Sequence, residues 1–138
     1  MSTREEQNKA VARRYFDGDH AAEELAPDFK AHLPGAPAPV NREEFLQQMS
    51  MIATAFSDTR TTIEDQVAEG DKVVTRITWR GIHSGNFQGL PPTGKQIAMT
   101  GTIVQRIKDG KIVDHWPQFD LMGMMQQLGA LPPPQPGM

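Results

Sequence analysis

The chain has 138 residues, of which 38% are hydrophobic and 22% charged, and this length fits one globular domain that can bury about two thirds of its unfolded surface. The formal net charge of -3 offers no basic surface for nucleic acid, and the absence of cysteine excludes disulfides, thiolate catalysis and cysteine-bound metal. No apolar run of a signal peptide follows the N-terminus and no stretch reaches the ~20 apolar residues of a membrane span, so we expect a cytoplasmic protein that binds neither nucleic acid nor membrane.

The first segment predicts a helix. Thr3 and Glu6 have the spacing of a capping box, and residues 4–17 follow with a helical period of apolar side chains before Gly18. Residues 20–29 then predict a short helical turn that ends near its proline.

A second helix follows a proline-rich stretch. Residues 32–40 are too rich in proline for a regular element and predict an extended loop. Asn41 and Glu44 repeat the capping spacing, and the sequence after them predicts a strongly amphipathic helix. Its apolar positions are Phe45, Met49, Ile52, Ala53 and Phe56.

From residue 59 onward the hydrophobic period changes from helical to alternating, which predicts strands. Two Gly/Asp turns divide this region into two antiparallel hairpins, built from residues 59–69, 72–83, 96–107 and 111–119. Helices followed by an antiparallel sheet predict an α+β fold with the helices on one face. We expect one domain over residues 1–131 and a disordered proline-rich tail over residues 132–138.

The turn at Asp109-Gly110 decides which side chains of the last two strands face inward. A two-residue turn would bring Asp114 inward, whereas a three-residue loop over residues 108–110 pairs Ile107 with Lys111 and keeps Asp114 outward. We expect the three-residue loop, because it gives one mostly apolar face, as a pocket wall has. That face carries Met99, Gly101, Ile103, Gln105, Val113, His115, Pro117 and Phe119. Alternation also groups Trp79 with His83 but does not fix the face they line.

Four stretches carry a family resemblance: LAPDFKAH at 25–32, GIHSGNFQGLPPTGK at 81–95, KDGKIVDHW at 108–116 and QQLG at 126–129. In this order they resemble the SnoaL-like polyketide cyclases of the nuclear transport factor 2-like superfamily. The resemblance implies a cone-shaped α+β domain whose curved antiparallel sheet wraps around helices and encloses a cavity. It also implies a homodimer or higher homo-oligomer, and an aldol cyclisation of a polyketide ester that needs neither metal nor cofactor.

Two positions depart from the family's pattern. In the family, an aspartate on the last strand moves the proton and a histidine on the neighbouring strand helps to hold it. The resemblance places these two groups at Pro117 and Ile103, which can neither accept a proton nor orient a base. It therefore predicts the fold well and the aldol mechanism poorly.

We expect an enzyme that moves a proton on a hydrophobic carbonyl substrate without a cofactor, as in cyclisation or isomerisation. The alternative is a non-catalytic small-molecule-binding protein on the same fold, which the two departures favour. Epoxide hydrolysis would need a buried Asp, Arg, Asp set that the expected inward face lacks. The four histidines show no HxH or HExxH spacing, so we expect no metal.

Two residues are candidates for catalysis. His115 faces inward, and an ordinary histidine pKa of about 6.5 would suit a base, although a histidine packed in the wall is the alternative. Asp120 follows the last strand and could act as a base or cap the next helix. The other expected pocket residues are Tyr15, His32, Met99, Ile103, Gln105, Pro117 and Phe119. His32 suits a ligand contact or a loop-anchoring hydrogen bond equally, and Gln105 suits binding of a carbonyl.

Overall fold

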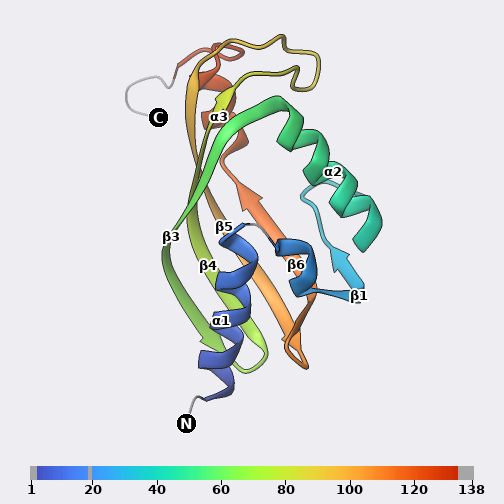
Figure 1. The fold of residues 1–138 in the computed structure, drawn as a ribbon. Helices are drawn as coiled ribbons and strands as arrows, with labels where there is room; N and C mark the ends of the chain where they lie inside the picture. The colour runs from blue at the N-terminus through green and yellow to red at the C-terminus, as the bar shows by residue number, and fades with distance from the viewer. Residues whose placement is uncertain (1–2, 19, 134–138) are drawn as a thin grey trace.

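The computed structural model describes residues 3–18 and 20–133 (Figure 1). Its helices are α1 (Arg4–Phe16), α2 (Arg42–Ala55) and the short α3 (Leu121–Gln127), with a 3-10 turn η1 (Ala21–Glu24) after α1. The strands are β1 (Leu25–Ala31), β2 (Val40–Asn41), β3 (Phe56–Glu69), β4 (Lys72–His83), β5 (Gln96–Lys108) and β6 (Lys111–Phe119). Most of the predicted disordered tail lies outside the described residues.

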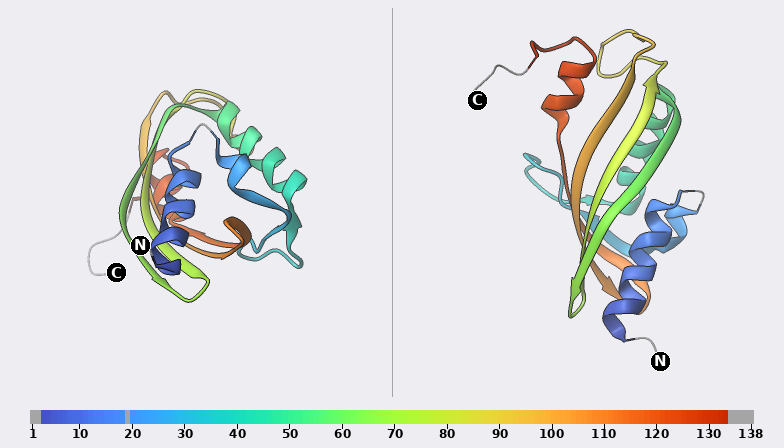
Figure 2. Two further views of the ribbon diagram at one scale, coloured as in Figure 1. Left: turned by 60° about the horizontal axis from the view of Figure 1, so that its bottom comes forward. Right: turned by 90° about the vertical axis from the view of Figure 1, so that its left-hand side faces the viewer.

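All six strands form one mixed sheet in the order β2-β1-β6-β5-β4-β3. Neighbours are antiparallel except β1 and β6, which are parallel. The long strands curl around α1, and α2 lies across the open side of the curl (Figure 2). The predicted α+β class and the curved sheet around helices are confirmed. The four predicted strands are confirmed as the hairpins β3–β4 and β5–β6. The sequence did not predict β1 and β2, which extend the sheet.

The segment around Pro27 is a strand where the sequence predicted a helical turn. Only residues 21–24 are helical, and β1 begins at Leu25. A proline normally interrupts a strand, but here it lies where the register between β1 and β6 shifts, so no ladder hydrogen bond needs its missing N–H. Burial of Leu25 and Phe29 in the core stabilises the strand.

Both predicted helix starts are confirmed. Thr3 Oγ1 accepts a hydrogen bond from the Glu6 N–H at 3.0 Å. At α2 the capping box is complete, because Asn41 and Glu44 each accept a hydrogen bond from the other's backbone N–H. The helix ends one residue before Phe56, which opens β3.

A bulge sets the register of the last hairpin. Asp109 and Gly110 both have positive φ, 51° and 77°, as a two-residue type I′ turn requires, so the predicted three-residue loop is wrong. The register then shifts by one residue, and Asp114 pairs with Arg106 instead of Gln105. Val113 is the extra residue of this bulge, and it keeps Asp114 outward despite the shorter turn.

The buried core lies between the concave side of the sheet and the helices. One cluster joins α1, α2 and β1 to the lower ends of the strands and includes Val11, Phe29 and Phe45. A second cluster, around Phe56, Met99 and Met124, packs beneath α3. None of the helices that the structure describes is long and apolar enough to cross a membrane.

Candidate functional site in the sheet interior

Three cross-strand pairs of β5 and β6 form a wall on the concave side of the sheet. The pairs are Gln105 with His115, Ile103 with Pro117, and Gly101 with Phe119. The first two pairs are buried, and the Phe119 ring lies over Gly101 so closely that a Cβ there would be 2.5 Å from it. The inward face predicted for these residues is therefore the one the structure shows.

His115 lies at the centre of an aromatic enclosure. The rings of Tyr15 from α1, Phe29 from β1 and Phe45 from α2 have centroids 5.5, 5.9 and 5.1 Å from its imidazole. Its side chain is only 3% exposed. Burial, helped by the nearby His32, lowers the pKa of His115 to about 3, so the imidazole is neutral at physiological pH.

Gln105 is the polar partner of His115 inside this wall. Its Nε2 lies 3.0 Å from His115 Nδ1, and the residue is 0% exposed. Tyr15 completes the polar groups near the imidazole, and burial raises the pKa of its phenol, which therefore stays protonated. The wall thus holds neutral hydrogen-bonding groups among apolar side chains.

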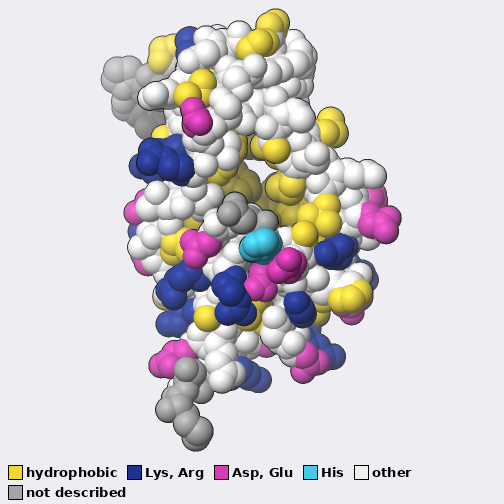
Figure 3. Space-filling view, in the orientation of Figure 1, with side chains coloured by type: hydrophobic (Ala, Val, Ile, Leu, Met, Phe, Trp, Pro, Cys, Tyr) yellow, Lys and Arg dark blue, Asp and Glu magenta, His cyan; other side chains and the backbone are white. Residues whose placement is uncertain are grey.

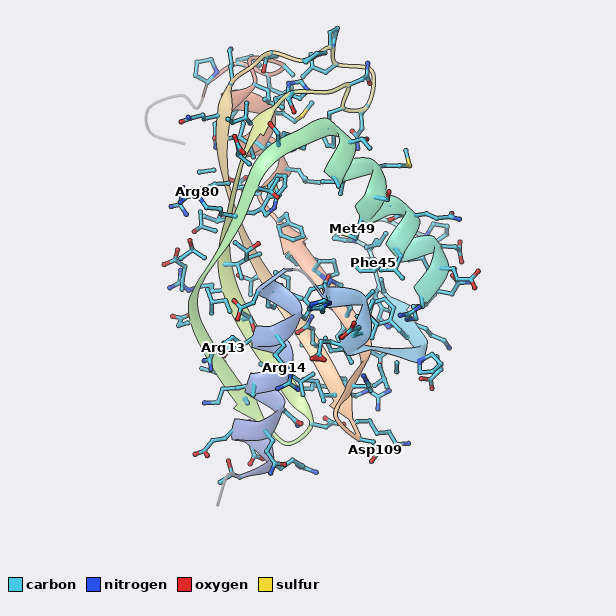
Figure 4. The ribbon with its side chains drawn as sticks, in the orientation of Figure 1. Arg13, Arg14, Phe45, Met49, Arg80 and Asp109 are labelled. Atoms are coloured by element: carbon cyan, nitrogen blue, oxygen red, sulfur yellow. The ribbon has the colours of Figure 1, made fainter. Side chains whose placement is uncertain are left out.

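The interior opens to the surface between the end of α1 and α2. Figure 3 shows a hollow there whose visible wall is mostly hydrophobic. Phe45 and Met49 lie on the side of α2 that faces the sheet, and Met49 remains 36% exposed (Figure 4). This hollow, between the helices that carry Tyr15 and Phe45, is the candidate entrance for a hydrophobic molecule.

His32 lies on the outer side of the sheet, away from the aromatic enclosure. Its Nε2 is 2.9 Å from Asp114 Oδ1, and its ring stacks on Trp116 with centroids 4.9 Å apart. Arg106 Nε donates to Asp114 Oδ2 at 2.7 Å. Burial alone would raise the pKa of the Asp114 carboxyl, but the hydrogen bonds from His32 and Arg106 outweigh it and hold the pKa below its usual range. This placement supports the anchoring role weighed for His32.

Asp120 is exposed and caps α3. Its Oδ1 accepts a hydrogen bond from the Gly123 N–H at 3.0 Å. Glycine at position 123 leaves room for this cap, because a Cβ there would overlap the Asp120 carboxylate and displace it. The geometry supports the capping role over the role of a base.

We predict that Asp120→Ala lowers the free energy of unfolding by about 1 kcal/mol, because the cap of α3 is lost. Asp120→Asn is the matched control, since asparagine caps equally well but cannot take up a proton. Urea unfolding and turnover of both variants measure the effect. Loss of activity in Asp120→Asn with unchanged stability would contradict the capping role and restore Asp120 as a base.

His83 and Trp79 lie on the concave side, in the upper part of the core. Both pack against Phe56, with ring centroids 5.4 and 5.1 Å away. The Thr93 N–H donates to His83 Nδ1 at 3.1 Å, which ties the long loop after β4 to the sheet. His83 is 0% exposed, and this contact fits the structural role that its glycine-flanked motif suggests.

The rest of the described surface is a weaker candidate for a binding site than the aromatic enclosure. Two open grooves of about 700 and 600 Å³ run along β3 and β4, where both include Thr59, Arg60 and Arg80, but they lie outside the aromatic enclosure. Arg80 points away from the interior (Figure 4). Within residues 3–18 and 20–133, no three His, Asp or Glu side chains are grouped to hold a metal ion.

Sequence reasoning missed two of the three aromatic walls. Phe45 stood out as an apolar helix position but not as a pocket residue, and Phe29 lay in the segment predicted as a helical turn. The signal for Phe29 was the stretch LAPDFKAH, whose apolar residues at 25, 26, 29 and 31 are the buried positions of β1.

Known proteins share this architecture. The profile of a family described as SnoaL-like polyketide cyclase matches residues 5–128. The chain is 35% identical over 110 residues to an aklanonic acid methyl ester cyclase of Streptomyces peucetius, a match that covers 78% of this chain and 72% of that relative. A nogalonic acid methyl ester cyclase of Streptomyces nogalater is 34% identical over 88 residues, which are 62% of this chain and 64% of the relative.

Solved structures extend the similarity to the fold. A candidate polyketide cyclase from Streptomyces antibioticus superposes with a TM-score of 0.77 and 36% identity, covering 89% of this chain and 99% of that one. A candidate hydroxylase from Streptomyces galilaeus has a TM-score of 0.84 and 26% identity, covering 94% and 85%. Proteins with different described activities therefore share the fold, and the reaction must be inferred from the interior itself.

Proposed function

Because the chain belongs to the SnoaL-like polyketide cyclase family, we propose that its interior binds a hydrophobic carbonyl compound and catalyses a cofactor-free proton transfer on it, as in cyclisation or isomerisation. The observation that supports this proposal is the neutral His115–Gln105 pair inside an otherwise apolar, aromatic enclosure. The imidazole of His115, held by Gln105, is the member of this pair that would orient a carbonyl group.

In the proposed reaction His115 acts at the carbonyl oxygen. A group whose conjugate acid has a pKa of about 3 is a weak base, but a neutral imidazole N–H is an effective hydrogen-bond donor to an oxygen that gains negative charge. Transfer of a proton from the carbon beside the carbonyl to a water molecule that enters from the opening between α1 and α2 creates such a charge. Low polarity around His115 strengthens the hydrogen bond in that state.

A non-catalytic binding protein is the second candidate. Ile103 and Pro117 stand opposite each other, two residues closer to the C-terminal end of β6 than the pair of Gln105 and His115. They occupy the positions at which the family resemblance expects a histidine and an aspartate. A pocket that keeps its shape but lacks this proton-transfer pair would bind a ligand and leave it unchanged.

Turnover and binding separate the two candidates. Aromatic ketones, polyketide methyl esters and ketosteroids form the test panel, with product detected by mass spectrometry and binding by thermal shift. Turnover supports the enzyme if it is lost in His115→Phe and retained in the control Gln118→Leu. Gln118 is exposed and pairs with Thr102 on the opposite face of β6. Binding without turnover across the panel supports the binder.

The proposal includes a homodimer or a higher homo-oligomer formed through the outer face of the sheet. Four apolar side chains stand in register across that face: Val67, Val74, Val104 and Trp116. Val67 is 64% exposed, and burial of such a band against a second copy would remove apolar surface from water.

Sedimentation velocity tests this assembly. Val67→Lys should shift the protein to the monomer, because a charged side chain at the β3 end of this apolar band would lose its hydration in the interface. Met51→Lys is the control, since Met51 is also exposed but lies on α2. A monomeric wild type, or an oligomer that tolerates Val67→Lys, would contradict the proposed interface.

A further inference from the structure

Gln105 is enclosed on all sides and therefore has no surface for a ligand. It is 0% exposed, whereas His115 in front of it retains 3%. Its amide nitrogen is 3.0 Å from His115 Nδ1, and its Oε1 is buried without a hydrogen-bond partner among the described residues. The sequence suggested that Gln105 binds a carbonyl, but its enclosure leaves it able to act only through His115.

The hydrogen bond from Gln105 fixes where the imidazole carries its proton. A nitrogen that accepts from an amide N–H must present its lone pair, so Nδ1 is unprotonated and the proton of the neutral ring sits on Nε2. Nε2 lies on the other side of the ring and is the nitrogen that Gln105 does not engage. In this tautomer His115 offers an N–H to the interior.

The opposite amide orientation is less favourable. It would place Oε1 toward Nδ1 and leave the NH₂ group, with two donors, in the position where Oε1 now lacks a partner. Buried N–H groups without partners are rarer in proteins than carbonyl oxygens without partners. Among the described residues, Gln105 is the side chain within hydrogen-bond distance of His115 Nδ1, so it selects the tautomer.

We propose that Gln105 is a positioning residue that holds His115 in its Nε2–H tautomer, so that the interior presents a hydrogen-bond donor suited to a ketone or ester oxygen. The choice of ligand rests on the proposed function, but the tautomer itself does not. A pocket built this way selects ligands whose buried polar atom is an acceptor and disfavours those that present only a hydroxyl donor.

Ring nitrogen NMR tests the proposal on the full chain without any ligand. The chain has four histidines, and the ring signals lost in His115→Phe identify those of His115. In the wild type, long-range ¹H–¹⁵N correlations should show the Nε2–H form in excess by about tenfold. In Gln105→Leu the excess should shrink severalfold, because leucine has a similar size and no donor.

Two results would overturn the proposal: a wild type in the Nδ1–H form, or an unchanged tautomer ratio in Gln105→Leu. If Gln105→Leu does not fold, Gln105→Met serves as the test variant, because the flexible methionine side chain fills irregular space and also lacks a hydrogen-bond donor. Gln118→Leu on the outer face is the control and should leave the ratio unchanged.

Kinetics separate this proposal from the proposed function. With a substrate found in the panel, Gln105→Leu should lower kcat on the order of tenfold and change KM less, because the donor matters most as charge develops on the oxygen. If no compound is turned over while the tautomer responds to Gln105, the positioning role stands and the proposed function fails. If a compound is turned over but the tautomer does not respond to Gln105, the proposed function stands and the positioning role fails.

Discussion

Replacing His115 by phenylalanine is expected to lower turnover by about 10²–10³-fold, which is the usual loss when one hydrogen-bond donor to a developing oxyanion is removed. The effect should fall on kcat more than on KM, because Tyr15, Phe29 and Phe45 continue to supply the apolar contacts that hold a ligand. Steady-state kinetics on a panel substrate, with melting temperature as the test of folding, measure it.

His115→Gln is the companion variant, since its amide can still donate a hydrogen bond to the carbonyl oxygen, but from a longer side chain that places the donor differently. Its turnover should fall between those of the wild type and His115→Phe. Equal activity of all three proteins would show that His115 is only a wall residue and that the chemistry, if any, lies elsewhere.

Acid sensitivity is the second large effect expected from His115. The folded pKa of about 3 lies below the unfolded value of about 6.5, so the unfolded chain binds a proton before the folded protein does. Stability from this group is therefore constant above about pH 6.5 and falls with pH by about 1.4 kcal/mol per unit until the folded pKa is reached.

The comparison of wild type with His115→Phe isolates this contribution. Between about pH 7.5 and about pH 4.5 the wild type should lose roughly 2–3 kcal/mol more than the variant in urea unfolding. The lowered pKa of Asp114 acts in the same direction, but its stability is lost only below about pH 4, where carboxylates titrate. Parallel pH profiles of the two proteins would mean that His115 is readily protonated in the fold.

Local signals explain which parts of the fold the sequence predicts. The starts of α1 and α2 depend on side chains three residues apart, and Thr3, Asn41 and Glu44 make the expected hydrogen bonds. The strand β1 was missed because its partner lies far along the chain, with Lys30 beside Asp114. No pattern within residues 20–31 reveals that pairing, whereas Pro27 argues locally against a strand.

The local sequence predicts one part of the candidate site, whereas the other part depends on contacts between distant segments. Alternation along β5 and β6 places Gln105 and His115 on the inward face, and the placement is correct because the bulge at Val113 offsets the error in the predicted turn. The depth of burial around them depends on Phe29 and Phe45, which come from elements distant in sequence. Hence the loss of basicity at His115 and the enclosure of Gln105 become visible only in three dimensions.

Without the bulge at Val113, the strands of the last hairpin would pair in a different register. If the strands zipped directly from the type I′ turn without the extra residue, Asp114 would stand opposite Gln105 inside, and the imidazole would move to the solvent side. The extra residue of this bulge thus decides whether the interior holds the carboxylate of Asp114 or the neutral imidazole of His115. Insertion or deletion of a single residue near this hairpin would turn every later side chain of β6 to the opposite face and so change the chemistry of the interior.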